Sequence, residues 1–407
     1  MRGLGGFWSL GSDLKAVFAA NGNPIDGLRG ISILMVVLFH CFFILKVALS
    51  PTAFAVFISG LPSLAQVGFN FDKAVDIFFV VSGHLIGAAL LREKISTGSV
   101  GLSPFYRRRF FRIVPLFWVA LLLYGSFAWK GDWASLIGSL FFVENLFPSL
   151  TKIVPVGWSL AIEVQFYVLI PFLFLLPVPV IFRVLWTLLA LTIAIRLGLL
   201  LLNPDFYRVS PLAYLIGGIS GAALLDTLYY PTWARASPIV LGLLIPLMIH
   251  FHAEWFRRRK RHLHWFGVAC LVVGLLFPSY ASEEIANPLL QLLGLTLDRS
   301  LVGLAVAIFI LSWELNQLKP AKFVQRLLSH WALAMWGRLV YPVYLFHLPM
   351  VAIAFLAVFG TTKPARIQGA SISDLLLAYP IALLLTLVLA LLLHILIERP
   401  FIRIGKR

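Results

Sequence analysis

Charged residues and cysteines are scarce in this sequence, and each scarcity excludes a class of protein. Lys, Arg, Asp and Glu make up 12% of the 407 residues, against 60% for hydrophobic residues. A soluble globular domain is about one-quarter charged, so this composition excludes an ordinary soluble fold. The only two cysteines, Cys41 and Cys270, lie in apolar stretches and exclude a disulfide framework.

Long apolar runs take up most of the chain, whose mean hydropathy is +0.94. Runs of this length predict an all-α fold, a polytopic bundle of transmembrane helices. Residues 237–250 are also apolar enough to cross a membrane. An additional span there would, however, move the basic run 257–261 or the C-terminus to the outer side of the membrane. We therefore expect them to form a re-entrant or interfacial helix. Ten spans are expected, at 31–49, 74–91, 113–128, 159–176, 184–202, 211–229, 265–280, 300–317, 337–358 and 375–397.

Basic residues outnumber acidic ones by 33 to 17, and the net charge is +16. In a soluble protein this excess would suggest nucleic-acid binding, which we do not expect here because the charge lies in loops. With both termini in the cytoplasm, the main basic clusters all fall on the cytoplasmic side, as the positive-inside rule requires. These clusters are 92–112, 257–261, 319–326 and 399–407.

The domain organisation follows from the same pattern. Residues 1–25 lack the apolar core and cleavage site of a signal peptide, so the first span is expected to serve as an uncleaved insertion signal. We expect 1–25 to be a cytoplasmic segment, 26–402 a single transmembrane domain, and 403–407 a basic cytoplasmic tail.

Arg29 and His40 are ionisable residues at the start of the first apolar run. Eleven helical residues make about 1100°, roughly 20° past three turns, so the two side chains share one helix face about 16 Å apart. Ionisable residues inside a membrane are costly and usually face a partner or a pathway. This pair therefore indicates a route for an anionic ligand that leads to a general base. The alternative is that Arg29 marks the cytoplasmic helix end and His40 is a hydrogen-bonded core residue.

Further polar motifs recur in order along the apolar runs. Each is short, but their order and spacing are specific when taken together. They are Asp26–Gly30 with His40, Asp76–Gly83, Phe105–Pro115, Trp158–Tyr167, Tyr341–His347 and Glu398–Pro400. From residue 24 to 401 the chain thus resembles the acyltransferase-3 family of integral membrane O-acyltransferases. It departs from the family pattern at His84, where an apolar or aromatic residue is usual, and at Tyr341–Pro342, where Ser-Tyr is usual.

The resemblance implies transfer of an acyl group, commonly acetyl from acetyl-CoA, to a hydroxyl group of a carbohydrate or similar acceptor. It implies no tightly bound cofactor, with acyl-CoA as the donor substrate, a glycan as the acceptor and lipids as neighbours. The bacterial inner membrane is the expected location. Two alternatives stay open: a secondary transporter of an anionic substrate, and a non-catalytic subunit of a polysaccharide export complex.

The chemistry assigns roles to the motif residues. Acyl transfer to a hydroxyl needs a base or an acyl-accepting nucleophile, and His40 suits both roles. Glu163, expected at the outer end of its span, could orient His40 or hold sugar hydroxyls. Arg29, Arg109 and Arg112 are predicted to bind the donor phosphates, although basic residues at a helix end are also ordinary topology signals.

The remaining candidates are polar residues of the same motifs, predicted to bind the acceptor or to support the catalytic residues. For His347 a hydrogen-bonded core histidine is an equally good interpretation. These candidates are Asp76, Ser82, Ser159, Tyr167, Tyr344 and His347. No metal site is predicted at the histidines between 250 and 264, which flank the basic run 257–261.

Overall fold

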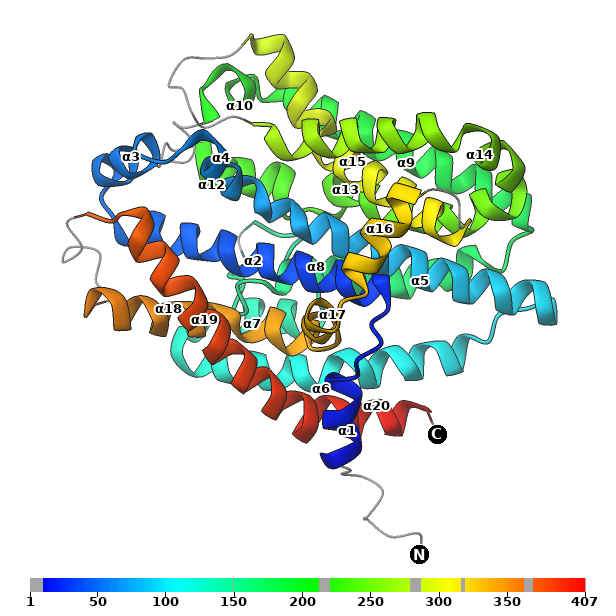
Figure 1. Cartoon of the computed structure of the whole chain (residues 1–407), viewed down its shortest axis with the longest axis horizontal. Helices are drawn as coiled ribbons and strands as arrows, with labels where there is room; N and C mark the ends of the chain where they lie inside the picture. The colour runs from blue at the N-terminus through cyan, green and yellow to red at the C-terminus, as the bar shows by residue number, and fades with distance from the viewer. Residues whose placement is uncertain are drawn as a thin grey trace, which may run out of the picture.

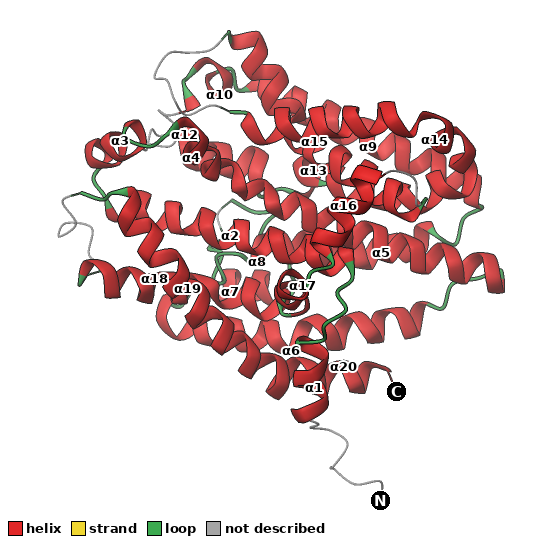
Figure 2. Cartoon of the chain, viewed as in Figure 1, coloured by secondary structure: helices red, strands yellow, loops and turns green. Residues whose placement is uncertain are grey.

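The computed structural model describes residues 10–148, 150–211, 220–278, 287–315, 319–361 and 369–406, and every regular element in these ranges is a helix (Figure 2). Within them, eight helices are long and apolar enough to cross a membrane. The chain is an integral membrane protein with the all-α fold that the sequence predicted. The main helices are α2 (Pro24–Ala48), α5 (Ala74–Thr97), α6 (Leu102–Ala128), α8 (Gly157–Leu173), α9 (Val178–Leu202), α14 (Ser237–Leu276), α15 (Pro288–Glu314), α18 (Val340–Phe359) and α19 (Ile372–Leu393).

Short helices connect the long ones or lie at their ends. They are α1 (Leu10–Val17), α3 (Pro51–Ser59), α4 (Ser63–Gln66), η2 (Val67–Lys73), α7 (Trp133–Leu140), α10 (Asp205–Arg208), α12 (Ser220–Leu224), η3 (Leu225–Tyr229), α13 (Thr232–Arg235), α16 (Lys319–Leu328), α17 (Trp331–Arg338), η5 (His394–Glu398) and α20 (Arg399–Lys406).

Helix α2 runs through the middle of the bundle (Figure 1). In this view α9, α14 and α15 lie on one side of it, and α6, α18 and α19 lie on the other. Helix α2 contacts α5, α17, α18 and α19 directly. The helix that carries Arg29 and His40 is therefore surrounded by helices from both halves of the chain.

The first turns of α2 are held closely against α17. Asn23 caps the helix by accepting a hydrogen bond from the backbone N–H of Ile25, and a proline follows at the first helical position. A Cβ atom at Gly30 would lie 1.9 Å from the carbonyl oxygen of Leu333, and one at Gly337 would lie 1.8 Å from that of Asp26. Only glycine allows the backbones to approach so closely, and this contact fixes the turn that carries Arg29.

Residues 237–250, for which we expected a re-entrant or interfacial helix, are helical and largely buried. They form the first part of α14, a 40-residue helix interrupted at His252, where φ is −135°. Residues 237–247 are all buried. A Cβ atom at Gly242 would lie 2.1 Å from the carbonyl oxygen of Val80 in α5, so the two helices are in close contact. Hydropathy and loop charge do not distinguish an interfacial segment from one buried inside the bundle, so this burial could not be predicted from them.

The expected span at 211–229 is only partly described, since residues 212–219 lie outside the described ranges. Its remainder forms α12 and the π-helical turn η3, which end before Pro231. The predicted number of ten spans is therefore not confirmed. Helix α8, with 17 residues, is also shorter than the other main helices.

Candidate functional site

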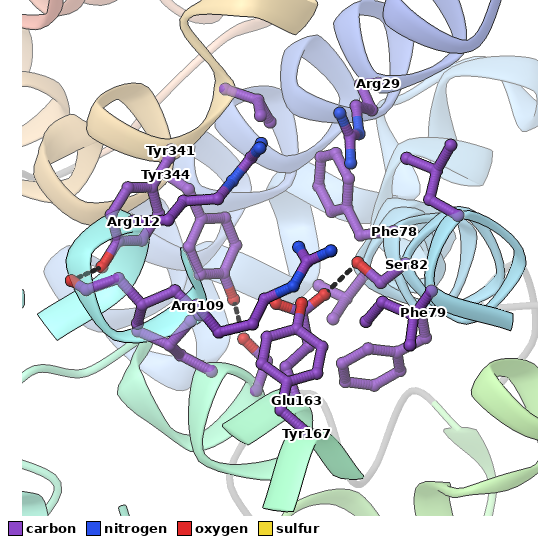
Figure 3. A pocket seen from close by; sticks show the side chains of 17 residues that line it. Arg29, Phe78, Phe79, Ser82, Arg109, Arg112, Glu163, Tyr167, Tyr341 and Tyr344 are labelled. Atoms are coloured by element: carbon purple, nitrogen blue, oxygen red, sulfur yellow. Dashed lines mark hydrogen bonds between the residues drawn. The ribbon is translucent and has the colours of Figure 1, made fainter. Parts of the chain in front are cut away.

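A polar pocket of about 180 Å³ lies between α2, α5, α6, α8 and α18 (Figure 3). The structure brings most of the predicted site residues to its walls, although they come from distant parts of the chain. The predicted residues that line it are Arg29, Ser82, Arg109, Arg112, Ser159, Glu163, Tyr167 and Tyr344. We call this space the arginine pocket.

Three guanidinium groups point into the arginine pocket, from Arg29, Arg109 and Arg112 (Figure 3). Arg109 and Arg112 lie three residues apart on one face of α6, as the motif predicted. The Arg109 guanidinium lies over the rings of Phe105 and Tyr167, at 5.6 and 5.4 Å from their centroids. None of the three arginines forms an ion pair with another described residue, so their N–H donors can bind an anion.

Glu163 lies in the same pocket, and this corrects our expectation that it would occupy the outer end of its span. Its carboxylate accepts a hydrogen bond from Ser82 and lies within electrostatic range of Arg29 and Arg109. The reason is the loop before α8: Ile153, Val154 and Val156 are buried, so the helix begins inside the protein. Glu163 is the seventh residue of this helix, about two turns from its start.

His40 and His347 form a hydrogen-bonded pair, with His40 Nδ1 and His347 Nε2 3.0 Å apart. The Nδ1 atom of His347 lies 2.8 Å from the carbonyl oxygen of Tyr344, and that of His40 lies 2.9 Å from the carbonyl oxygen of Val36. Carbonyl oxygens only accept, so in neutral rings both Nδ1 atoms carry the proton. His347 Nε2 then accepts from His40, and the Nε2 atom of His40 keeps a free lone pair.

His40 does not line the arginine pocket but borders a second, larger space of about 570 Å³, which we call the large cavity. The two spaces are separated by about one helical turn. On η2 and α5, Asp72 lines the large cavity and Val75 the arginine pocket. Tyr344 of α18 likewise lines the pocket, while Leu348 lines the cavity. Arg29 and His40 thus border two spaces instead of the single route that we expected.

Tyr344 and Ser159 form the wall between the two spaces. The Tyr344 hydroxyl lies 2.5 Å from Ser159 Oγ, and its ring packs edge-on against Phe78 with centroids 6.2 Å apart. Tyr344 is also one turn before His347, to which it offers its carbonyl oxygen. Tyr344 therefore contacts both the arginine pocket, through its side chain, and the histidine pair, through its carbonyl oxygen.

Asp76, expected to bind the acceptor or to support the catalytic residues, lies behind the lining residues and pairs with Arg299, which lines the large cavity. It is fully buried and lines neither space; its oxygens lie 2.9 Å from Arg299 Nη1 and 3.1 Å from Arg235 Nη2. Arg299 also pairs with Asp72 at 2.5 Å. A buried charge persists only when it is paired, so Asp76 acts as a structural link between α5, α13 and α15.

The two departures from the family motifs have small structural consequences. His84 lines neither space, and its Nε2 atom lies 3.5 Å from Glu314 Oε1. Pro342 falls in the first turn of α18, where a missing N–H costs no helical hydrogen bond. Tyr341 donates a hydrogen bond to the carbonyl oxygen of Ile113 at 2.6 Å.

Several polar residues of the large cavity could not be assigned to a site from the sequence. Lys46, Arg196 and Gln291 all line it. Lys46 and Arg196 stood out only as cations inside apolar runs, which is a usable signal because such residues are costly in a membrane. Gln291 had no such signal, since a single amide near a helix start is unremarkable in a sequence.

Comparisons with known proteins agree with the motifs. A family model described as an acyltransferase domain matches residues 23–395. The chain is 28% identical over 353 residues to the peptidoglycan O-acetyltransferase OatA of Listeria monocytogenes, covering 81% of this chain and 49% of that protein. It is 30% identical over 164 residues to the O-acetyltransferase OatA of Staphylococcus aureus, covering 36% of this chain and 24% of that protein. The chain thus spans about half the length of the first relative, and no solved structure matches it.

Proposed function

Because the chain belongs to the acyltransferase-3 family of membrane acyltransferases, we propose that it is an O-acyltransferase that moves an acetyl or short acyl group from acyl-CoA to a hydroxyl group of a glycan. The observation that carries this proposal is the pairing of two spaces across one wall. One space holds three guanidinium groups that form no ion pair with another described residue, and the other holds a histidine whose Nε2 atom is free among these residues.

The arginine pocket suits the phosphate groups of the donor. Phosphates bind guanidinium groups through pairs of charge-assisted hydrogen bonds, and Arg29, Arg109 and Arg112 offer such donors without a competing ion pair. The rise of about 16 Å from Arg29 to His40 leaves room for an extended thioester arm between phosphates and base. The arm has to pass the side chains of Tyr344 and Phe78, so donor binding displaces this wall.

In the chemical step, the Nε2 atom of His40 takes the proton of the acceptor hydroxyl as its oxygen attacks the thioester carbonyl. A C–O bond forms, the C–S bond breaks, and the leaving thiolate recovers the proton from the imidazolium. In a second version of the step, Nε2 itself attacks the thioester carbonyl: an N–C bond forms, the C–S bond breaks and the CoA thiolate leaves. The acceptor hydroxyl then attacks the acyl carbon, the N–C bond breaks, and the hydroxyl proton passes to the thiolate. A quench of the donor-loaded protein followed by peptide mass spectrometry distinguishes the two versions, because only the second gives an acylated His40.

The relative from Listeria is named for peptidoglycan, which makes a cell-envelope glycan a reasonable acceptor class for this chain. In the proposed orientation, the arginine pocket opens toward the cytoplasm, where acyl-CoA is made, and both termini lie on that side of a bacterial inner membrane. The large cavity then faces the opposite side and receives the acceptor.

The test uses the purified protein in detergent with radiolabelled acetyl-CoA and a set of cell-wall oligosaccharides. Label in the sugar fraction supports the proposal, and His40→Ala should remove it while the protein remains folded. A secondary transporter, for which two spaces across a wall are also suitable, would bind an anion without consuming acetyl-CoA. Absence of both sugar labelling and thioester cleavage in folded wild-type protein would contradict the acyltransferase proposal.

A further inference from the structure

We infer that the large cavity beside His40 binds the acceptor and selects a glycan that carries an anionic group, a carboxylate or a phosphate. This inference rests on the proposed acyl transfer, because His40 is the group that the glycan hydroxyl would have to reach. It goes beyond that proposal by assigning a charge to the acceptor and naming the residues that recognise it.

The large cavity has the size and lining of a ligand site. Its volume of about 570 Å³ falls in the range of roughly 300–1,000 Å³ that is typical of small-molecule sites. Aromatic rings line it and offer flat faces for a sugar ring. These rings belong to Phe39, Phe43, Trp158, Tyr229 and Tyr230.

The acidic residues of the cavity are already neutralised. Asp72 pairs with Arg299 at 2.5 Å. Asp298 lies 3.3 Å from Arg196 and 3.8 Å from Lys73. These aspartates therefore cannot serve a cationic ligand without breaking buried ion pairs, which is costly.

Hydrogen-bond donors, in contrast, remain free. Gln291 is 2% exposed and lines the cavity, and its Nε2 atom has no partner among the described residues. The Nε atom of Arg299 is likewise without one. Lys46 lines the cavity two turns after His40 and forms no ion pair with the described part of the chain. Buried donors without acceptors are destabilising, so a ligand rich in acceptors would bind here.

The positive charge of Lys46 is not a topology signal that directs membrane insertion. Lys46 lies in the last turn of α2, at the end opposite to Arg29. In the proposed orientation this is the outer side, where the positive-inside rule predicts few lysines and arginines. A cation in a cavity with low-dielectric walls focuses the field on an anion. Lys46 is therefore the residue that would distinguish an anionic from a neutral sugar.

The test compares binding of three tetrasaccharides to the detergent-solubilised full chain by calorimetry. One is made of N-acetylglucosamine alone, one alternates N-acetylglucosamine with glucuronate, and one carries a phosphate monoester. Lys46→Gln removes the charge and keeps a donor; Lys130→Gln, at an exposed lysine after α6, is the matched control. We expect Lys46→Gln to weaken binding of an anionic ligand on the order of 10- to 100-fold and to leave the neutral sugar unchanged.

If Lys46→Gln loses more affinity for one of the two anionic sugars, the anionic group of that sugar, carboxylate or phosphate, is the one that the cavity prefers. Equal affinity of the wild type for neutral and anionic sugars, or an equal loss of both in Lys46→Gln, would overturn the inference. Transfer assays separate this result from the proposed function. If acyl groups are transferred equally to neutral and anionic sugars, the proposed function stands and the inference is refuted. If anionic sugars bind in a Lys46-dependent way but no acyl group is transferred, the inference stands and the proposed function is refuted.

Discussion

The Nδ1 atom of His40 and the Nε2 atom of His347 lie 3.0 Å apart, and the carbonyl oxygen of Val36 lies 2.9 Å from the same Nδ1 atom, so both contacts leave Nε2 as the free nitrogen of His40. His347 is fully buried and is itself anchored by the carbonyl oxygens of Val343 and Tyr344. In the proposed reaction His347 is a positioning residue, because it holds the ring of His40 without touching the substrate. The pair joins α2 to α18, so the position of the base depends on the packing of these two helices.

His347→Leu is expected to lower kcat by up to about 100-fold, because His40 loses one of the two acceptors that hold its ring and keeps only the carbonyl oxygen of Val36. His347→Gln keeps an oxygen that can accept from His40 Nδ1 and should recover part of the loss. The KM for acyl-CoA should stay unchanged in both variants, since the arginine pocket is intact. Steady-state kinetics on purified protein measure both constants. Equal loss in the Leu and Gln variants would show that His347 only fills space.

Arg109→Ala and Arg112→Ala are expected to weaken acyl-CoA binding, each by about 1.5–3 kcal/mol, because each removes a charge-assisted contact to phosphate. Wild-type binding should also weaken as salt is added. Calorimetry with a non-hydrolysable acyl-CoA analogue gives the affinities. Arg108→Ala is the control, since Arg108 is exposed and does not line the pocket. Unchanged affinity of the double variant for the acyl-CoA analogue would show that Arg109 and Arg112 do not bind the donor and act only as topology signals.

Glu163→Gln is expected to leave acyl-CoA bound at least as tightly as in the wild type, with a gain of roughly threefold to tenfold at low salt. The reason is that the substitution removes the one carboxylate among the described lining residues of the pocket, which lies within electrostatic range of Arg29 and Arg109. Turnover should fall, because the hydrogen bond from Ser82 to a carboxylate becomes weaker. Binding and single-turnover measurements separate the two effects. A large loss of affinity with the fold preserved would mean that Glu163 mainly holds the arginines in place.

The sequence was sufficient to predict the fold class and most of the arginine pocket. Arg29 was conspicuous without any structure because an ionisable side chain inside an apolar helix is costly, and Ser82, Glu163 and Tyr167 belong to the motifs that resemble the family. Their spacing on single helices also placed Arg109 and Arg112 on one face. All these features belong to single helices, whose faces follow from the spacing of residues.

Relations between helices could not be predicted in this way. That Arg29 and His40 share one helix face is compatible with a single continuous route between them or with two separate spaces. Tyr344, which comes from the other end of the chain, separates the two spaces. The depth of Glu163 depends on a loop that enters the protein before α8 begins. The partners of Asp76 lie at Arg235 and Arg299, more than 150 residues away, so no local pattern indicates them.

Gly242→Ala is expected to destabilise the protein by about 1–3 kcal/mol, because the new Cβ atom would lie 2.1 Å from the carbonyl oxygen of Val80. Backbone cannot move away as a flexible side chain can, so α5 and α14 would have to separate. Thermal unfolding in detergent measures the effect. Gly198→Ala in α9 is the matched control, because no atom lies within 4 Å of its Cβ position. If both variants unfolded at the wild-type temperature, residues 237–247 would not pack against α5.

Glu144 should make the stability of the protein depend on pH. It lies in the loop between α7 and α8, is 1% exposed, and its Oε2 atom has no hydrogen-bond partner among the described residues. Burial raises the pKa of this carboxyl group from its ordinary 4.5 to about 7 in the folded protein. The folded state thus favours the protonated form. The stabilisation is fully present below pH 4.5 and is lost as the pH rises through 7.

The unfolding temperature of the wild type should therefore decline between about pH 5 and pH 8, and Glu144→Gln should make this decline smaller, because the amide stays neutral throughout. Scanning calorimetry in detergent at several pH values measures both curves. Glu254→Gln is the control, since Glu254 is exposed on α14 and should keep the wild-type slope. Glu144→Gln should also be more stable than the wild type at pH 8, where the wild-type carboxylate is charged and buried. Parallel curves for wild type and Glu144→Gln would mean that water or a partner group solvates this carboxylate in the folded protein.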